Sequence, residues 1–263
     1  MRKYWMTFRL GVANALHYRG NLAAGFATYA MFILVFFCLW RNMYAQSDMP
    51  EMTLTQMIWY LCITEIIAFG ANPRATGGVV QDVKNGNIAY QLLRPYNYVG
   101  YKYAESMGPV AVNTLLFAAA GSVLGFCIVG PIAGFRPWTL LPGALSMILG
   151  TSLLFFIQMA IGLTAFFIED PSGIGLVVGK AISMLGTFLP IEFLPAGIRQ
   201  VVQNLPFSYV SLAPARLMVG FEGGLFFRCL CLQVGYRAAF IGLCALLMRR
   251  GRRAIQALSL IHI

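Results

Sequence analysis

Charged side chains are scarce in this sequence. They make up 11% of its 263 residues, whereas a soluble globular domain has roughly 25%. Hydrophobic residues reach 59%. A water-soluble fold of this length would have too few charges to cover its surface. The composition therefore excludes a soluble protein and indicates one that crosses a membrane several times.

Motifs for catalysis and for cofactor binding are also missing. The sequence has no GxxxxGK[ST] phosphate loop, no HExxH and no GxSxG,. Its six cysteines form no CxxC pair and nearly all lie in apolar runs, where cysteine behaves as a small hydrophobe. We therefore expect no enzyme activity, no cofactor and no metal. No nucleic-acid module accompanies the net charge of +10, so we expect no nucleic-acid partner.

Six apolar runs are long enough to cross a bilayer, which needs about 20 mostly apolar residues per helix. They cover residues 21–40, 55–71, 107–129, 138–168, 172–191 and 225–248. The fold class that follows is all-α, with one transmembrane domain over residues 21–248. Residues 1–20 mix basic and aromatic side chains, as in a helix that lies in the membrane interface. A frayed basic tail is the alternative for this segment.

Basic residues give the orientation. The N-terminal segment, the loop over 73–106 and the tail over 249–257 hold 12 of the 19 Lys and Arg residues. Loops rich in Lys and Arg stay on the cytoplasmic side, so both termini and this loop are predicted to be cytoplasmic. Residues 258–263 match the translated mosaic end of a sequencing adapter. We expect them to be an artefact and the natural C-terminus to be truncated.

The cytoplasmic loop contains a short amphipathic pattern. Asn85-Gly86 is a turn signal,, and Pro95 ends the helix that precedes it, because proline disfavours α geometry in the residue before it. Between them, an apolar set is expected to be exposed together; it comprises Ile88, Tyr90, Leu92 and Leu93. Such a patch requires a partner or the bilayer.

A second irregular segment precedes the last span. Pro190, Pro195 and Pro206 bracket a stretch that is too short to cross the membrane, and Phe207 follows it. Irregular backbone at membrane depth must be buried in protein or face a cavity. A plain extracellular loop is the alternative.

The stretch over 86–98 resembles the G-x-hydrophobic-x-Y-x-L-L-x-x-P loop of ATP-binding-cassette (ABC) permeases of the type-2 export class. Nearly the whole chain is similar to the daunorubicin-resistance-like branch of paired permeases with unknown substrates. The resemblance implies a coupling helix that docks on an ATPase subunit, with contacts from Gly86, Ile88, Tyr90, Leu92, Leu93, Arg94 and Pro95. It also implies that the proline-rich segment forms re-entrant helices near the extracellular gate.

The chain would then be the permease subunit of an exporter in the bacterial plasma (inner) membrane. A second copy, or a homologous permease, would supply the other half of the pathway, and two separate ATPase subunits would drive it. A secondary transporter or channel that works without an ATPase is the alternative. A membrane-embedded enzyme is less consistent with the sequence, because His, Asp and Cys residues do not gather at one membrane depth.

Three ionisable residues fall inside predicted spans, namely Glu65, Lys180 and Arg237. A charge at mid-membrane is costly and is usually paired or placed beside a polar cavity. We expect Glu65 to pair with Lys180 or Arg237. The alternative is that each side chain reaches an interface by snorkelling.

Overall fold

The computed structural model describes residues 2–17, 19–46, 52–132, 135–184 and 194–261, and every regular element in these ranges is helical. The α-helices are α1 (Arg2–His17), α2 (Arg19–Gln46), α3 (Leu54–Phe69), α4 (Ala75–Lys84), α5 (Asn87–Leu92), α6 (Tyr98–Val129), α7 (Leu140–Leu163), α8 (Ser172–Ser183), α9 (Ala196–Val202), α10 (Ser208–Val219) and α11 (Gly223–Ile261). Two 3-10 turns, η1 (Pro137–Thr139) and η2 (Thr164–Phe166), flank α7.

Local sequence signals explain where several helices begin. Thr53 and Gln56 form a capping box at the start of α3, in which the Gln56 amide donates to Thr53 Oγ1 at 3.3 Å and the Thr53 amide donates to Gln56 Oε1 at 2.9 Å,. Asn97 caps α6 by accepting a 3.0 Å hydrogen bond from the Gly100 amide,. Gly86 separates α4 from α5 with φ of 71°, a left-handed conformation that glycine adopts without steric cost.

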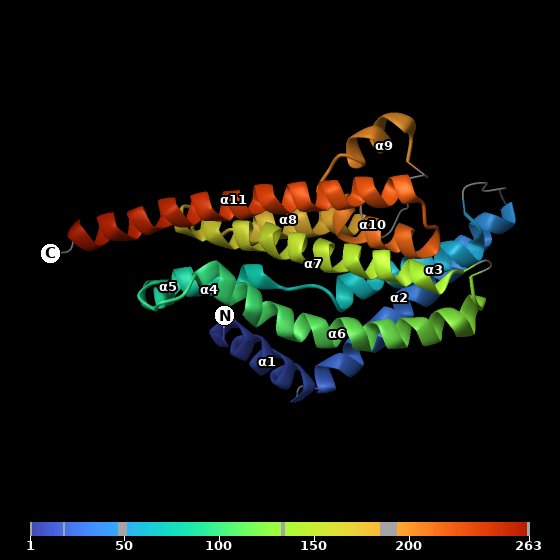
Figure 1. Ribbon diagram of the computed structural model, residues 1–263, viewed down its shortest axis with the longest axis horizontal. Helices are drawn as coiled ribbons and strands as arrows, with labels where there is room; N and C mark the ends of the chain where they lie inside the picture. The colour runs from blue at the N-terminus through green and yellow to red at the C-terminus, as the bar shows by residue number, and fades with distance from the viewer. Residues whose placement is uncertain (1, 18, 47–51, 133–134, 185–193, 262–263) are drawn as a thin grey trace.

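The long helices run side by side, with α7 at the centre (Figure 1). More than half of the apolar window of α7 is buried, 56%, against 11% for those of α2 and α11. Helices α10 and α11 both pack against α7, and α10 also packs against α3. The N-terminus, the α4–α5 segment and the C-terminus lie toward the same end of the bundle (Figure 1).

Within the described ranges, four helices are long and apolar enough to cross a membrane, over 22–46, 98–129, 137–166 and 223–253. They overlap the predicted first, third, fourth and last spans. Helices α3 and α8, at the predicted second and fifth spans, are apolar but shorter. Helix α6 begins nine residues before the predicted third span, because the Asn97 cap starts it while the sequence is still polar. Residues 185–191 of the predicted fifth span lie outside the described part of the chain.

Candidate functional site

Helices α4 and α5 form a helical elbow at the end of the bundle that also holds the two termini (Figure 1). Ile88 packs the elbow against the rest of the protein. Its side chain is 1% exposed and belongs to a buried hydrophobic cluster with Val79 and Tyr98. On the opposite side of α5, Tyr90 is 73% exposed and Leu93 is 84% exposed. The elbow thus presents apolar side chains outward from an anchored base.

The prediction that Ile88 would be exposed is wrong. In an α-helix, residues four apart share a face, so Ile88 and the half-buried Leu92 both pack inward against the same cluster. Tyr90 and Leu93, three apart, share the outer face. The exposed apolar patch is therefore smaller than the sequence suggested, and Arg94 adds a charge to it.

Ionic contacts hold the elbow against its neighbours. Lys84 Nζ lies 3.4 Å from Asp170 Oδ1 in the turn between α7 and α8. The Ser172 hydroxyl and amide donate to the Asp170 carboxylate at 2.7 and 3.3 Å. These two hydrogen bonds, and secondarily Lys84, lower the pKa of Asp170,. Nearby, Asp82 accepts a 2.8 Å hydrogen bond from the Tyr98 hydroxyl and lies 2.9 Å from Lys102 Nζ.

The break between α3 and α4 is held by one side chain of α7. Gln158 Oε1 accepts a 2.8 Å hydrogen bond from the Ala75 amide, and Gln158 Nε2 donates to Asn72 Oδ1 at 2.8 Å. Thr76 Oγ1 also donates to the Gln158 carbonyl, at 3.1 Å. Sequence analysis missed this role of Gln158. The sequence does contain a sign of this role. Gln158 is a single side-chain amide in an otherwise apolar run, and a buried polar group there needs a hydrogen-bond partner,.

The described part of the proline-rich segment contains the short helix α9 and leads into the short helix α10. Pro195 directly precedes α9, and Pro206 and Phe207 precede α10; Pro190 lies outside the described residues. Helix α10 has 12 residues and is buried along most of its length, so it is too short to cross a bilayer alone. The Ser208 hydroxyl donates to the Val202 carbonyl at 2.7 Å and joins the two helices.

The expected pairing of intramembrane charges is not observed. Glu65 on α3 is 2% exposed, and its Oε1 has no hydrogen-bond partner in the described part of the chain. Lys180 is exposed on α8. Arg237 on α11 lies over the Phe156 ring, with Cζ 6.0 Å from the ring centroid. Helix α10 packs against both α3 and α11, the helices that carry Glu65 and Arg237.

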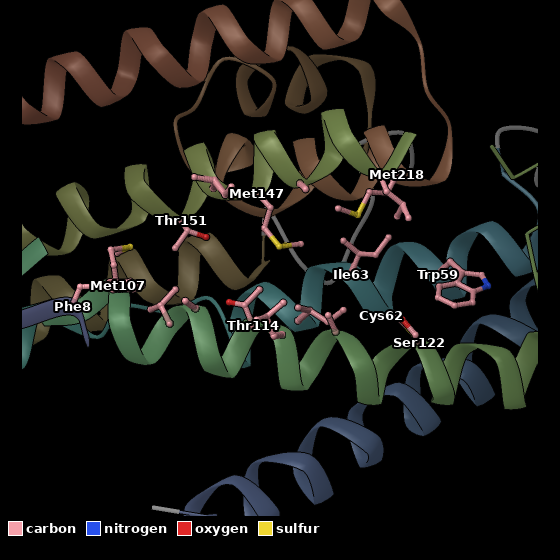
Figure 2. Close-up of a pocket in the computed structure, with 18 of the residues that line it drawn as sticks. Phe8, Trp59, Cys62, Ile63, Met107, Thr114, Ser122, Met147, Thr151 and Met218 are labelled. Carbon is pink, nitrogen blue, oxygen red and sulfur yellow. The ribbon is translucent and has the colours of Figure 1, made fainter. Parts of the chain in front are cut away.

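A long apolar groove lies between α6 and α7, with α3 as its floor and α1 at one end. Its volume is about 1020 Å³. Figure 2 shows its two ends, with Phe8 and Met107 at one and Trp59 and Ser122 at the other. Among the described residues, none that lines it is charged. Across the described ranges, no three His, Cys, Asp or Glu side chains gather in a way that could hold a metal ion.

Comparison with known proteins identifies one family. The model of the ABC-2 family transporter proteins (ABC2_membrane_6) matches residues 21–259, which is most of the chain. The match includes the elbow, the proline-rich segment and the walls of the groove on α3, α6 and α7, but not α1. No curated protein matches the chain.

Proposed function

The chain belongs to the ABC-2 transporter family, and we propose that it is the permease subunit of an ABC exporter from the daunorubicin-resistance-like branch. Membership makes it a multi-pass membrane component of a transporter, and not the subunit that hydrolyses ATP. In the proposed complex it forms half of the translocation pathway, opposite a second copy or a homologous permease. Two separate ATPase subunits bind the cytoplasmic face, in the bacterial inner membrane.

The outer face of α5 carries this proposal. Leu93 and Tyr90 are 84% and 73% exposed on an anchored helix, beside the basic residues that predict the cytoplasmic side. A fixed pair of large apolar side chains in water is typical of a surface that a partner protein covers. The type-2 permease motif falls on the same residues, so the ATPase is the partner that we assign to it.

The elbow is suited to passing motion inward. Ile88 packs α5 against the cluster of α4, α6 and α7. Gln158 connects the start of α4 to α7, and Asp170 connects the end of α4 to the turn between α7 and α8. Movement of the docked ATPase would therefore shift α4 and α7 together. In this mechanism, ATP binding and hydrolysis alter the relative stabilities of inward-open and outward-open arrangements. Short helices α9 and α10 form the re-entrant gate on the opposite side.

The decisive experiment is co-purification of the permease with the ATPase encoded beside its gene, comparing wild type with Leu93→Asp. We expect the substitution to lower the recovered ATPase at least tenfold, because it places a carboxylate in the apolar contact. The fold should survive, since the Leu93 side chain is 84% exposed. Asn85→Asp, which adds the same charge to the exposed turn of the elbow, serves as the control and should leave recovery unchanged.

Undiminished recovery with Leu93→Asp would remove the assignment of α5 as the docking surface. Transport by the purified chain alone, without any ATPase, would instead favour a secondary transporter or channel. The mass of the intact complex tests the remaining part of the proposal, because it distinguishes one permease from two.

A further inference from the structure

The groove between α6 and α7 follows one face of α6 over most of its length. Its small side chains on that helix, Ala104, Ala111 and Ala118, recur every seven residues. Seven residues make nearly two turns, so these alanines lie in one line along the helix. The recess that they leave separates two helices that follow one another in the sequence.

The groove is as long as a membrane is thick. Its lining on α6 extends from Tyr103 to Phe126, which at a 1.5 Å rise per residue is about 35 Å. The hydrocarbon core of a bilayer is about 30 Å thick. The apolar lining on α6 is thus long enough to match the whole hydrocarbon core,.

This length favours an extended apolar occupant such as a hydrocarbon chain. The lining is apolar and aromatic, with only isolated hydroxyl and thiol groups such as Thr114, Thr151 and Cys62. Sites for compact polar ligands instead use several converging polar groups, and an ion would be left without ligands here.

One end of the groove carries positive charge. Tyr4, Trp5 and Phe8 of α1 close that end, and the same helix bears Arg2, Lys3 and Arg9 but no acidic residue. Both arginines and Lys3 are exposed. Juxtamembrane basic residues attract anionic lipid headgroups, so this end of the groove matches a negatively charged headgroup above an apolar chain.

We propose that the groove between α6 and α7 binds an acyl chain of an anionic phospholipid, with the phosphate of the headgroup beside the cations of α1. The lipid enters sideways from the leaflet next to α1. The site depends only on the residues of this chain, so it does not require the ATPase subunit. Its ligand differs from the surrounding bulk lipid in two respects, because the chain lies between helices and the headgroup is selected by charge.

The test uses the full-length chain in nanodiscs that contain a phosphatidylglycerol or a phosphatidylcholine with a photoreactive diazirine in the acyl chain. After illumination, labelled peptides are identified by mass spectrometry. We expect labelling of the facing walls of α6 and α7 to be several-fold stronger with phosphatidylglycerol. Ala118→Trp, which fills the groove, should lower this labelling several-fold. Ala119→Trp is the matched control, because Ala119 is exposed on α6 and does not line the groove.

Two further variants keep the result interpretable. Ser122→Phe narrows the same groove at its far end, so it should reproduce the effect if Ala118→Trp fails to fold. Arg2→Gln combined with Arg9→Gln should remove the preference for phosphatidylglycerol while labelling by phosphatidylcholine persists. Equal loss in the Ala118 and Ala119 variants, labelling confined to outer helix faces, or equal labelling by both lipids in wild type would each overturn the proposal. So would cross-links across the groove between two permease copies, which would assign the groove to a dimer interface.

Discussion

The side-chain amide of Gln233 donates a 2.8 Å hydrogen bond to the main-chain carbonyl of Tyr209. The same amide nitrogen also reaches the Ser146 carbonyl at 3.0 Å and the Ser146 hydroxyl at 2.9 Å. One fully buried side chain of α11 thus joins α7 and the first turn of α10. This contact holds the short helix α10 inside the bundle, where it could not span the membrane by itself.

Removing this amide should destabilise the fold. Gln233→Leu retains the bulk of the side chain but leaves the Ser146 hydroxyl without its partner. Hydrogen bonds between membrane helices contribute about 0.6–2 kcal/mol each, so we expect a loss of about 1–2 kcal/mol in the free energy of unfolding. Denaturation of the purified protein in detergent, followed by tryptophan fluorescence, measures it. Gln81→Leu, at an exposed site on α4, should have little effect. Equal stability of the two variants would contradict this role for Gln233.

A second close contact fixes the N-terminal helix. A Cβ added at Gly108 would lie 2.5 Å from the Phe8 carbonyl oxygen and 2.9 Å from the Val12 amide nitrogen, and main-chain atoms cannot move aside as a flexible side chain can. Gly108→Ala should therefore separate α1 from α6. We expect faster amide hydrogen exchange over residues 2–17. At Gly100, the nearest atom to an added Cβ is Tyr4 Cε1 at 3.5 Å, so Gly100→Ala should leave exchange unchanged.

Much of the helical framework could be predicted from the sequence, because an apolar run of about 20 residues has few alternatives to a transmembrane helix. Asn85-Gly86 also gave the turn between α4 and α5 correctly. The orientation of α5 could not be predicted in the same way. Six residues make fewer than two turns, and its apolar residues occur on both faces. Only the packing of Ile88 against Val79 and Tyr98 shows which face is buried.

The partners of polar residues within the bundle could not be predicted either, because they depend on contacts between segments that are far apart in the sequence. Glu65 was expected to pair with Lys180 or Arg237 because opposite charges in lipid attract, but Lys180 is exposed on α8 and Arg237 lies over the Phe156 ring. The 12 residues of α10, Ser208–Val219, are too few to be recognised as a span. The roles of Gln158 and Gln233 depend on main-chain groups more than 80 and 20 residues away in the sequence. The groove likewise depends on the separation of α6 and α7, which no local pattern specifies.

The Asp170 carboxylate offers a test by titration. Hydrogen bonds from Ser172 stabilise its charged form most, and Lys84 adds to this effect, so its pKa is lowered. We expect the ¹³C-carboxyl resonance of Asp170 in detergent micelles to titrate below the ordinary aspartate pKa of about 3.9. Ser172→Ala should raise the midpoint more than Lys84→Gln does. A folded-state pKa below the unfolded value means that the contact stabilises the fold fully above the unfolded pKa, and that this contribution is lost as pH falls through the folded pKa. An unshifted midpoint in wild type would contradict this account.

The contact between Gly162 and Val79 offers a way to test two steps separately. One step is docking of the ATPase on α5, and the other is the proposed transmission of its motion from the elbow to α7. A Cβ at Gly162 on α7 would lie 2.7 Å from Val79 Cβ and 3.2 Å from the Thr76 carbonyl oxygen. Gly162→Ala must therefore push α4 away from α7, while the outer face of α5 with Tyr90 and Leu93 is unchanged. We expect the variant to recover the ATPase as wild type does, but the ATPase activity of the complex in nanodiscs to fall several-fold. Gly179→Ala is the control, since an added Cβ there meets open space.

If recovery and activity were both normal while hydrogen exchange over α4 showed that it had moved, the α4–α7 contact would not transmit motion. If recovery itself failed, this contact would act by shaping the docking surface, and the path of transmission would have to pass through Ile88 and α6.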